Sequence, residues 1–440
     1  MYSFYLAVGV FFLAYALISL EKFHKTIVAL MGAGIIMAGQ VLSQSEAFYS
    51  EDFGVDWNVI ILLISMMVII NVMKPTGLFE YIAIKSAKVA KGSPYGIMAI
   101  FAFVTAFVSA FLDNVTTVLL ITPIVVYICE KLEVNVVPYL IVEALASNVG
   151  GTATLIGDPP NIMIASKAHF TFNDFVVHLT PVIVVIMALF IAMLKLVFGK
   201  GLKTTAEAKA RIMALDESGV IKDKRCMVIS LLVLGVVIAG FILHAELHLQ
   251  PATIALFGAA LLMLLLAVEE PHHLLAEVEW TAIFFFIGLF IVVGAVVKVG
   301  FVNMLASAVV HTTGTNMLRA STVILWFSAV ASAVIDNIPY VATMNPLIIN
   351  MGQQLWPGTS PEMLNHGQLL PVWWALSLGA CLGGNGTAIG ASANVVVVSM
   401  SEKMGKKISF VTFMAYAFPF WLMSIVVSNL YIWLRYFAFR

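Results

Sequence analysis

The feature that most constrains this chain is a pair of polar interruptions that occurs twice within long apolar sequence. Residues 111–124 read FLDNVTTVLLITPI, and residues 334–347 read VIDNIPYVATMNPL. Residues 149–161 read VGGTATLIGDPPN, and residues 382–394 read LGGNGTAIGASAN. A hydrocarbon environment penalises each unpaired backbone or polar group by several kcal/mol. Four such breaks in matched positions therefore predict a transport site built from broken helices.

The composition identifies the chain as an integral membrane protein. Of its 440 residues, 61% are hydrophobic and 11% are charged, whereas a soluble globular chain carries about 25% charged residues. The net charge is −1 and no polybasic run occurs, which excludes nucleic acid as a partner. No GxxxxGK[ST] motif is present, so we expect transport to use an ion gradient or a separate ATPase subunit. We expect no cofactor.

Apolar runs of about 17–25 residues predict ten membrane crossings. They lie at about 2–20, 26–43, 57–73, 138–167, 172–198, 226–243, 252–268, 280–298, 371–400 and 410–434. The two Gly-rich breaks interrupt the crossings 138–167 and 371–400. Two further segments, 95–130 and 319–350, carry Asp-Asn near their middle, and each is either one long crossing or a re-entrant hairpin with the polar pair at its tip.

A duplication organises these segments into two halves. Asp113 and Asp336 are separated by the same number of residues as the two tryptophans that begin the third and eighth crossings, and Asn161 and Asn394 repeat at a slightly larger spacing. With the Asp-Asn segments as hairpins, each half contains five crossings, and an odd number gives the halves opposite orientations. We therefore predict an all-α membrane protein of ten transmembrane helices in two inverted repeats of five, each with one re-entrant hairpin and one broken helix.

The same pattern predicts the domain boundaries and the orientation. The first inverted repeat covers 1–198, a linker covers 199–225, and the second repeat covers 226–440. Most of the 23 Lys and Arg residues then fall on the side of the membrane that holds the linker. By the positive-inside rule this side is cytoplasmic, which puts both termini outside the cytoplasm. The expected location is the inner (plasma) membrane.

Three aspartates in the breaks are the candidates for carrying protons. Ionisable groups at membrane depth are costly and mark functional sites. Asp113 and Asp336 lie at the two predicted tips, where they either couple to protons or only cap the half-helices. Asp158 lies in the first Gly-rich break, and Ala391 replaces it in the second. Asp158 is either a one-sided ion or proton site or the N-cap of the helix that begins at Pro159.

The other polar side chains of the breaks complete the predicted substrate or ion site, because amides and hydroxyls can coordinate an ion or hydrogen-bond a solute. The predicted set is Asp113, Asn114, Thr116, Thr117, Asn148, Thr152, Thr154, Asp158, Asn161, Asp336, Asn337, Asn385, Thr387, Ser392 and Asn394. Glu143 lies in the apolar run before the first Gly-rich break, where we expect it to pair with backbone or Asn. No metal-ligand motif occurs, and no metal site is expected.

Neither the tips nor the Gly-rich breaks contain Lys or Arg. A carrier of dicarboxylate, phosphate or sulfate needs cationic groups or bound sodium ions to offset the charge of its substrate. The acids at the tips instead favour a cation, or a neutral hydroxylated solute that is exchanged against protons. Half-helix N-termini attract partial negative charge, so the missing basic residues disfavour anion transport without excluding it.

Over nearly all of its length the chain resembles the ion transporter superfamily, and within it the ArsB/NhaD group. GGTATLIGDPPN (150–161) and GGNGTAIGASAN (383–394) carry this resemblance most specifically. The group includes arsenite efflux permeases, sodium–proton antiporters and P-protein-like carriers. The resemblance implies a scaffold and a transport domain, with hairpin tips and broken helices meeting at the substrate site. Dicarboxylate carriers of the superfamily have Ser-Asn-Thr at the tips, and the Asp-Asn pairs of this chain depart from that pattern.

Two transport hypotheses follow. The leading one is a proton-coupled efflux antiporter for arsenite or antimonite, because trivalent arsenic is a neutral trihydroxide at neutral pH that amides and hydroxyls can hydrogen-bond. The alternative is a sodium–proton antiporter in which the aspartates bind sodium. A channel is disfavoured because a pore needs no inverted pair of gated sites. A membrane enzyme is disfavoured because the spans contain no nucleophile–base pair and no clustered His/Glu motif.

Overall fold

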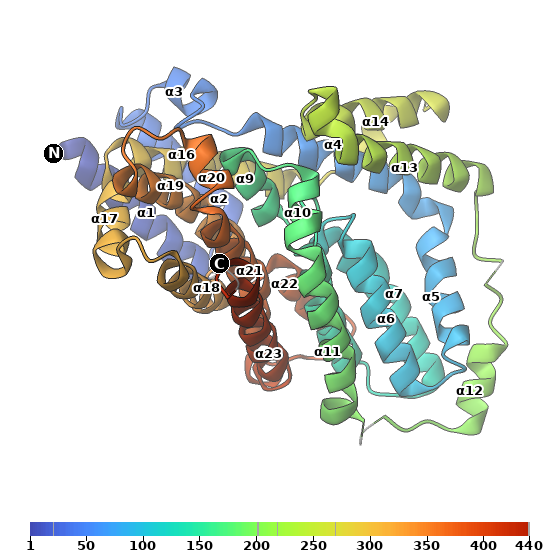
Figure 1. The fold of residues 1–440 in the computed structure, drawn as a ribbon. Helices are drawn as coiled ribbons and strands as arrows, with labels where there is room; N and C mark the ends of the chain where they lie inside the picture. Colours follow the sequence, from blue (N-terminus) through green and yellow to red (C-terminus); the bar gives the residue numbers. More distant parts are fainter. Residues whose placement is uncertain (21, 200–201, 218, 269, 439–440) are drawn as a thin grey trace.

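Every regular element in the part of the chain that the structure describes is helical. The computed structural model describes residues 1–20, 22–199, 202–217, 219–268 and 270–438 (Figure 1). The predicted linker 199–225 includes residues 200, 201 and 218, which lie outside the described residues. The prediction of an all-α membrane protein is confirmed.

The helices of the N-terminal half follow the apolar runs closely. They are α1 (Tyr2–Ser19), α2 (Lys25–Ala38), α3 (Gln44–Tyr49), α4 (Trp57–Met73), α5 (Leu78–Val89), α6 (Pro94–Ser109), α7 (Asn114–Leu132), α8 (Val137–Gly151), α9 (Pro159–Ala168), α10 (Phe172–His178) and α11 (Thr180–Phe198), with a 3-10 turn η1 (Lys74–Thr76). The predicted crossing 172–198 is two helices that meet at Leu179. Pro181 stands in the first turn of α11, where its missing N–H has no intrahelical acceptor to lose.

The C-terminal half repeats this order. After α12 (Ala206–Met213) come α13 (Lys224–Leu247), α14 (Pro251–Leu265), α15 (Pro271–Ala276), α16 (Trp280–Lys298), α17 (Phe301–Thr313), α18 (Met317–Val334), α19 (Asn337–Leu355), α20 (Pro361–His366), α21 (Leu370–Gly383), the 3-10 turn η2 (Gly384–Gly386), α22 (Ser392–Lys403) and α23 (Phe410–Tyr436). Both Asp-Asn segments are helix–turn–helix units, and both Gly-rich breaks interrupt a helix. The breaks therefore occur where the sequence predicts them.

Among the described residues, eight helices are long and apolar enough to cross a membrane. By length and composition they are Tyr2–Ser19, Trp57–Thr76, Asn114–Leu132, Thr180–Phe198, Lys224–Leu247, Trp280–Lys298, Met317–Val334 and Phe410–Tyr436. Two of them, α7 and α18, are arms of the predicted hairpins. The interrupted crossings 138–167 and 371–400 consist of two shorter helices each, because the Gly-rich segments prevent one continuous helix.

Corresponding helices of the two halves pack in corresponding ways. In the first half α6 packs on α8 and α5 on α7, and in the second half α18 packs on α21 and α17 on α19. Contacts also cross between the halves, since α2 packs on α16 and α4 packs on α14 (Figure 1). The two halves therefore interlock, and residues far apart in the sequence meet at their junction.

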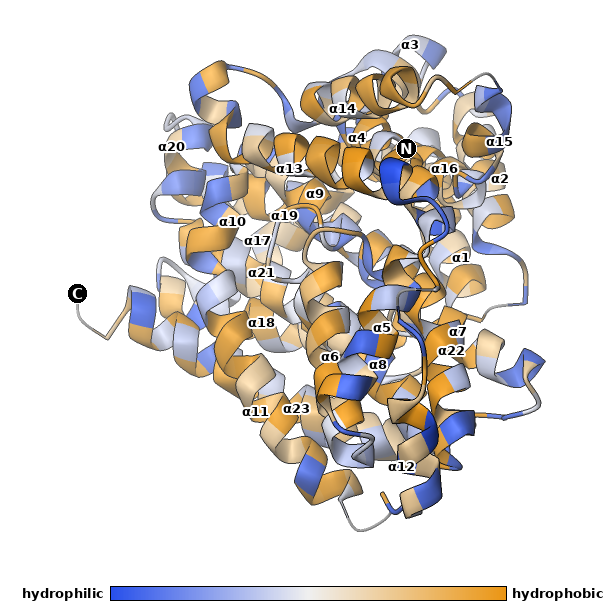
Figure 2. Ribbon diagram, turned by 90° about the vertical axis from the view of Figure 1, so that its right-hand side faces the viewer, coloured by the Kyte–Doolittle hydropathy of each residue, from blue (hydrophilic) through white to orange (hydrophobic). Residues whose placement is uncertain are grey.

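The outer surface of the helices is apolar. Phe12, Phe103, Phe257 and Phe327 are among the large hydrophobic side chains exposed on the surface of the chain. Figure 2 shows that hydrophobic residues cover most of the long helices, whereas hydrophilic residues gather in the connecting segments and in short helices such as α12. This distribution suits helices whose outer faces meet lipid.

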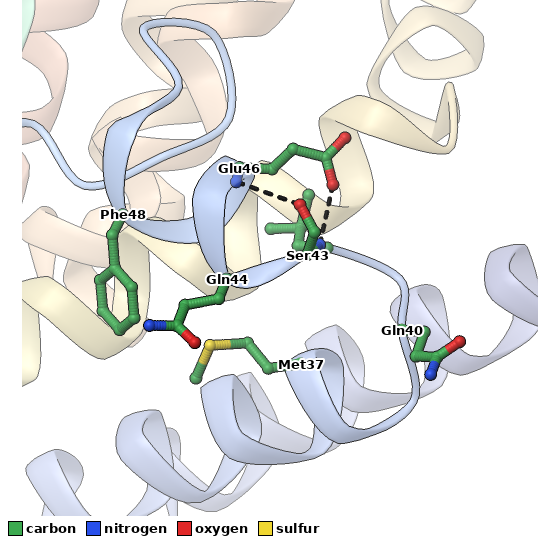
Figure 3. A pocket seen from close by; sticks show the side chains of 7 residues that line it. Met37, Gln40, Ser43, Gln44, Glu46 and Phe48 are labelled. Atoms are coloured by element: carbon green, nitrogen blue, oxygen red, sulfur yellow. Dashed lines mark hydrogen bonds between the residues drawn. The ribbon is translucent and has the colours of Figure 1, made fainter.

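The short helix α3 links the first half to the end of α16. Ser43 and Glu46 form a reciprocal capping box at its N-terminus, and both line a surface pocket with Met37, Gln40 and Phe48 (Figure 3). Lys298 Nζ donates to Glu46 Oε1 at 2.6 Å. This hydrogen bond, with those from Ser43, lowers the pKa of Glu46 to about 2.

Candidate functional site

The four breaks meet at the junction of the two halves. Helix α9, the second part of the first broken helix, contacts α19, which begins at the second Asp-Asn tip. Helix α22, the second part of the other broken helix, contacts both α7 and α8. Each half therefore brings its tip against the broken helix of the other half, and the predicted site residues are drawn together from distant parts of the chain.

The Asp158 carboxylate lies between the amides of both tips. Asn114 Nδ2 lies 3.3 Å from Asp158 Oδ1, and Asn337 Nδ2 lies 3.2 Å from Asp158 Oδ2. Asp158 is 1% exposed, so these bonds form in the protein interior. Although Asp158 precedes α9, its side chain makes no capping hydrogen bond to that helix. The interpretation of this side chain as an N-cap is therefore wrong, and its carboxylate is directed to the two tips.

Asn148 joins the two halves beside this carboxylate. Its Nδ2 donates to Asn385 Oδ1 at 2.8 Å and to Asn394 Oδ1 at 3.0 Å, and its Oδ1 accepts from Asn114 Nδ2 at 3.0 Å. All four asparagines are buried. The result is a continuous chain of amides from the first tip, through the first broken helix, to the second broken helix.

The asparagine that ends each Gly-rich motif holds its break open. Asn161 Nδ2 donates to the carbonyl oxygen of Thr154, and Asn394 Nδ2 donates to that of Thr387, each at 2.9 Å. These bonds satisfy carbonyl groups that a broken helix leaves without an amide donor, and an unsatisfied buried carbonyl costs about 1–3 kcal/mol. In both halves, an asparagine at the end of the motif donates to a carbonyl oxygen that the broken helix leaves without an amide donor.

Close backbone approach explains the glycines of the first break. A Cβ atom added to Gly157 would lie 2.6 Å from the carbonyl oxygens of both Gly151 and Ser109. These contacts are with backbone, which cannot rotate away as a side chain can. The chain therefore crosses itself at a separation that only glycine permits.

The two tip aspartates occupy equivalent positions but have different partners. Asp113 caps α7, where its Oδ1 accepts from Thr116 N at 2.9 Å. Asp336 caps α19 through Ile338 N at 3.2 Å and also accepts from Ser392 Oγ at 2.9 Å. The capping alternative therefore holds for both carboxylates. It does not preclude a second role for Asp336, whose other oxygen is directed toward α22.

Lys25 enters the site from outside the breaks. Its Nζ donates to Asp336 Oδ2 and to Ser392 Oγ, both at 2.7 Å, and it lies 5.0 Å from the centre of the Phe285 ring. The segments of the tips and breaks themselves contain no Lys or Arg, as noted from the sequence. In space, however, a basic residue at the start of α2 reaches the second tip.

The remaining predicted residues divide into two groups. The Thr152 hydroxyl donates to a carbonyl of its own helix α8, whereas the hydroxyls of Thr154 and Thr387 donate to carbonyls at the ends of α6 and α18 and so tie each Gly-rich break to the helix before the tip of its own half. Thr116 contributes its backbone N–H to Asp113, and the buried Thr117 hydroxyl has no hydrogen-bond partner among the described residues. These residues support the site and do not reach the Asp158 carboxylate.

Three contributors were not predicted as site residues. They are Lys25, Ser377, whose hydroxyl donates to Asn161 Oδ1 at 2.7 Å, and Cys381, whose thiol lies 3.5 Å from the same oxygen. Ser377 and Cys381 lie shortly before the second Gly-rich motif, and their small size in a helix next to a break was the available signal. For Lys25 the sequence offered no signal except a lysine at the start of an apolar run.

Glu270, His272 and His273 form an exposed group on and next to α15 whose ligand atoms lie within 4.8 Å of one another. These side chains are all exposed, and they are not part of the buried site around Asp158. The group carries no assignment.

Comparison with known proteins places this geometry in context. The chain matches the family model described as CitMHS, citrate transporter, over residues 15–379. An uncharacterized transporter of Mycobacterium tuberculosis is 46% identical over 436 residues, which are 98% of each chain. The P protein of Mus musculus is 31% identical over 503 residues, which cover 97% of this chain and 59% of the P protein.

A solved structure has the same overall fold. The crystal structure of the YdaH transporter of Alcanivorax borkumensis superimposes with a TM-score of 0.58, covering 99% of this chain and 98% of that one. The sequences are 13% identical, so the likeness concerns the fold alone.

Proposed function

The chain belongs to the citrate transporter (CitMHS) family of the ArsB/NhaD-type ion transporters, and on this premise we propose that it is a proton-coupled antiporter that exports arsenite or antimonite. The family and its relatives are transporters, so the chain is a multi-pass membrane transporter and not an enzyme. The resemblance drawn from the Gly-rich motifs is thereby confirmed. The substrate and its coupling ion are our proposal.

One observation carries this proposal: a single buried carboxylate, Asp158, accepts hydrogen bonds from Asn114 and Asn337 at the two tips. A neutral trihydroxide needs both donors and acceptors, which amides and hydroxyls supply. A proton that neutralises Asp158 removes the negative charge to which the amides of Asn114 and Asn337 donate. Proton binding is then coupled to rearrangement of the two tips, and this coupling is what exchange of a proton for a solute requires.

We propose ten transmembrane helices in two inverted repeats, residues 1–198 and 226–440, with 95–130 and 319–350 as re-entrant hairpins and 138–167 and 371–400 as broken helices. The corresponding packing of α6 on α8 and of α18 on α21 supports this assignment. So do the two aspartate-capped helices α7 and α19.

We further propose the plasma membrane as the location, with residues 199–225 in the cytoplasm and both termini outside. Cysteine labelling tests the orientation. The partly exposed native Cys226 is first replaced, and a single cysteine is then introduced at Asp52 or at Lys209. A membrane-impermeant maleimide applied to whole cells should label the cysteine at 52 and not the one at 209. The reverse labelling pattern contradicts the assignment.

Reconstitution in liposomes tests the substrate. We expect arsenite and antimonite to dissipate an imposed proton gradient in liposomes that contain the purified protein, and not in empty liposomes. Citrate, which the family description names, should have no effect. Its carboxylates would meet Asp158, while the Lys25 ammonium is already paired with Asp336.

The alternative is a sodium–proton antiporter with the same site. It is favoured by one observation: Asn114 Nδ2 bridges Asp158 Oδ1 and Asn148 Oδ1, so a carboxylate oxygen and an amide oxygen lie next to each other, and hard cations prefer oxygen ligands. Dissipation of the gradient by sodium or lithium but not by arsenite selects this alternative. Retention of activity only with a co-expressed ATPase subunit would instead indicate the ATP-driven form of export.

A further inference from the structure

A second buried carboxylate lies in the first half, away from the partners of Asp158. Glu143 lies on α8, five residues before Asn148, and is 2% exposed. Its carboxyl interacts with the hydroxyls of Thr105 on α6 and Thr122 on α7. Three helices that pack against one another thus direct oxygen atoms toward one point.

None of these oxygen atoms has a hydrogen-bond partner among the described residues. Both carboxyl oxygens of Glu143 and the hydroxyls of Thr105 and Thr122 are buried, and the contacts between them fall short of hydrogen-bond geometry. The expectation that Glu143 pairs with backbone or Asn is therefore wrong. Leaving a buried polar group without a partner costs about 1–3 kcal/mol, and more for a charged one, so such groups require an explanation such as a bound ion.

The charges nearby do not compensate Glu143. Helix α6 contains no charged residue, α7 carries Glu130 and Lys131 only near its C-terminus, and Glu143 is the single charged residue of α8. The Cys129 thiol on α7 is a titratable group that interacts electrostatically with the carboxyl. The surroundings are hydroxyl and carboxyl oxygens, which are the ligands of small hard cations.

The second half lacks this arrangement. At the repeat-related positions Ser328 replaces Thr105, Leu376 replaces Glu143 and Asn345 replaces Thr122, while Tyr340 stands at the position of Thr117. The Tyr340 and Ser328 hydroxyls lie 2.9 Å apart and satisfy each other. The second half therefore packs the corresponding helices with Leu376 in place of the carboxyl, so packing alone does not require Glu143. The carboxyl of the first half is thus an addition to a fold that packs without it.

We propose that Glu143, Thr105 and Thr122 form a site for a small hard cation, a proton or a sodium ion, that drives the transport cycle. The inference rests on the proposed ion-coupled transport and is separate from the solute site around Asp158. Helix α8 connects the two, since it carries both Glu143 and Asn148. Binding of a cation at Glu143 would act on the amide chain through this helix.

Carbodiimide labelling tests the site without any transport measurement. Dicyclohexylcarbodiimide, an apolar reagent, reacts with protonated carboxyls in apolar surroundings, and mass spectrometry locates the product. We expect labelling of Glu143 in the purified protein to fall as the pH rises. If sodium occupies the site, sodium chloride lowers the labelling at constant pH, whereas choline chloride does not. No labelling of Glu143, or labelling that responds to neither pH nor sodium, overturns the proposal.

Transport by Glu143→Gln tests the driving role. In liposomes we expect this variant to lose gradient-driven accumulation of radioactive arsenite, or of radioactive sodium, by at least about tenfold while retaining exchange across the membrane without a gradient. Glu143→Asp should restore part of the accumulation, and Glu130→Gln, which removes the exposed carboxylate near the C-terminus of α7, should resemble the wild type. Thr105→Val and Thr122→Val should weaken accumulation, whereas Ser65→Ala, a buried hydroxyl on α4, should not.

The outcomes separate the two proposals. If Glu143→Gln retains full accumulation, or loses exchange and accumulation together in a protein that still elutes as one species, the driving role is wrong. If the wild type moves neither arsenite nor sodium, the proposed function fails, and the pH and sodium dependence of labelling still decides whether Glu143 binds a cation.

Discussion

The side-chain amide of Asn337 lies 3.2 Å from Oδ2 of Asp158, although 179 residues separate them along the chain. Asn114 of the first half reaches the other oxygen of the same carboxylate. The second half has Ala391 where the first has Asp158, so the two tips share one acid. The surroundings of this carboxylate are therefore symmetric in their tip amides but not in the acid that these amides share.

Replacement of Asp158 by Asn should abolish most transport. The new side chain keeps the shape, but its NH2 group is directed at the amide of one tip, so a donor faces a donor. Hydrogen bonds to charged groups contribute about 1.5–3 kcal/mol, and we therefore expect a loss of roughly tenfold to a hundredfold in transport rate. Liposome flux measures it, with Asp52→Asn in an exposed loop as the control. Wild-type flux in Asp158→Asn would remove this carboxylate from the mechanism.

A double-mutant cycle should reveal the coupling between Lys25 and Asp336. Thermal unfolding in detergent of Lys25→Met, Asp336→Asn and the double variant gives the interaction energy. We expect about 1 kcal/mol, at the low end for contacting residues, because the Lys25 side chain is 31% exposed and solvent screens the pair. The exposed Lys298–Glu46 pair is the matched control and should show a smaller coupling. Equal interaction energies for the two pairs would mean that the environment of the second tip does not strengthen the Lys25–Asp336 ion pair.

Truncation of Asn148 should destabilise the junction of the two halves. Asn148→Ala removes the donor to Asn385 Oδ1 and Asn394 Oδ1 and leaves both buried oxygens without it. Each unsatisfied group costs about 1–3 kcal/mol, which should lower the thermal midpoint clearly. Asn58→Ala, at an exposed position, should leave it unchanged. Similar midpoints for both variants would show that the amide chain is replaced by water at little cost.

A methyl group at Gly157 should not be accommodated. Gly157→Ala places Cβ 2.6 Å from two backbone carbonyl oxygens, and overpacking of this kind costs about 1–3 kcal/mol. We expect lower yield of folded protein, a lower thermal midpoint and loss of transport. Gly9→Ala on α1, where no atom lies within 4 Å of the added Cβ, serves as the control. A Gly157→Ala protein with wild-type stability would show that the two segments of the break can separate.

Sequence periodicity predicted the elements well because lipid imposes simple rules on them. Helices α4 and α16 begin and end at the predicted residues, 57–73 and 280–298, since uninterrupted apolar runs leave no other choice. The predicted single crossing 172–198 failed at Leu179. One proline in a strongly apolar run was too weak a signal to distinguish a helix start from a kink.

The sequence predicted which residues belong to the site better than it predicted which of them contact one another. The motif positions identified Asp158 and the asparagines, because polar groups in apolar sequence must be satisfied by one another. They did not indicate that Asp158 turns away from its own helix, nor that Lys25 reaches Asp336. Both depend on how α2, α9 and α19 pack, and a single sequence holds no record of that packing.

The sequence by itself determined that the chain enters a membrane and which polar residues break its helices, and it predicts two related halves. These follow from local composition and repetition, because apolar length and backbone satisfaction are local requirements. Only the tertiary structure decided the partners: one carboxylate shared by two tips, a lysine that reaches the second tip, and a carboxyl at Glu143 that has no hydrogen-bond partner among the described residues. Which side chains bind one another depends on the distances between them, and these distances are set by the packing of the helices.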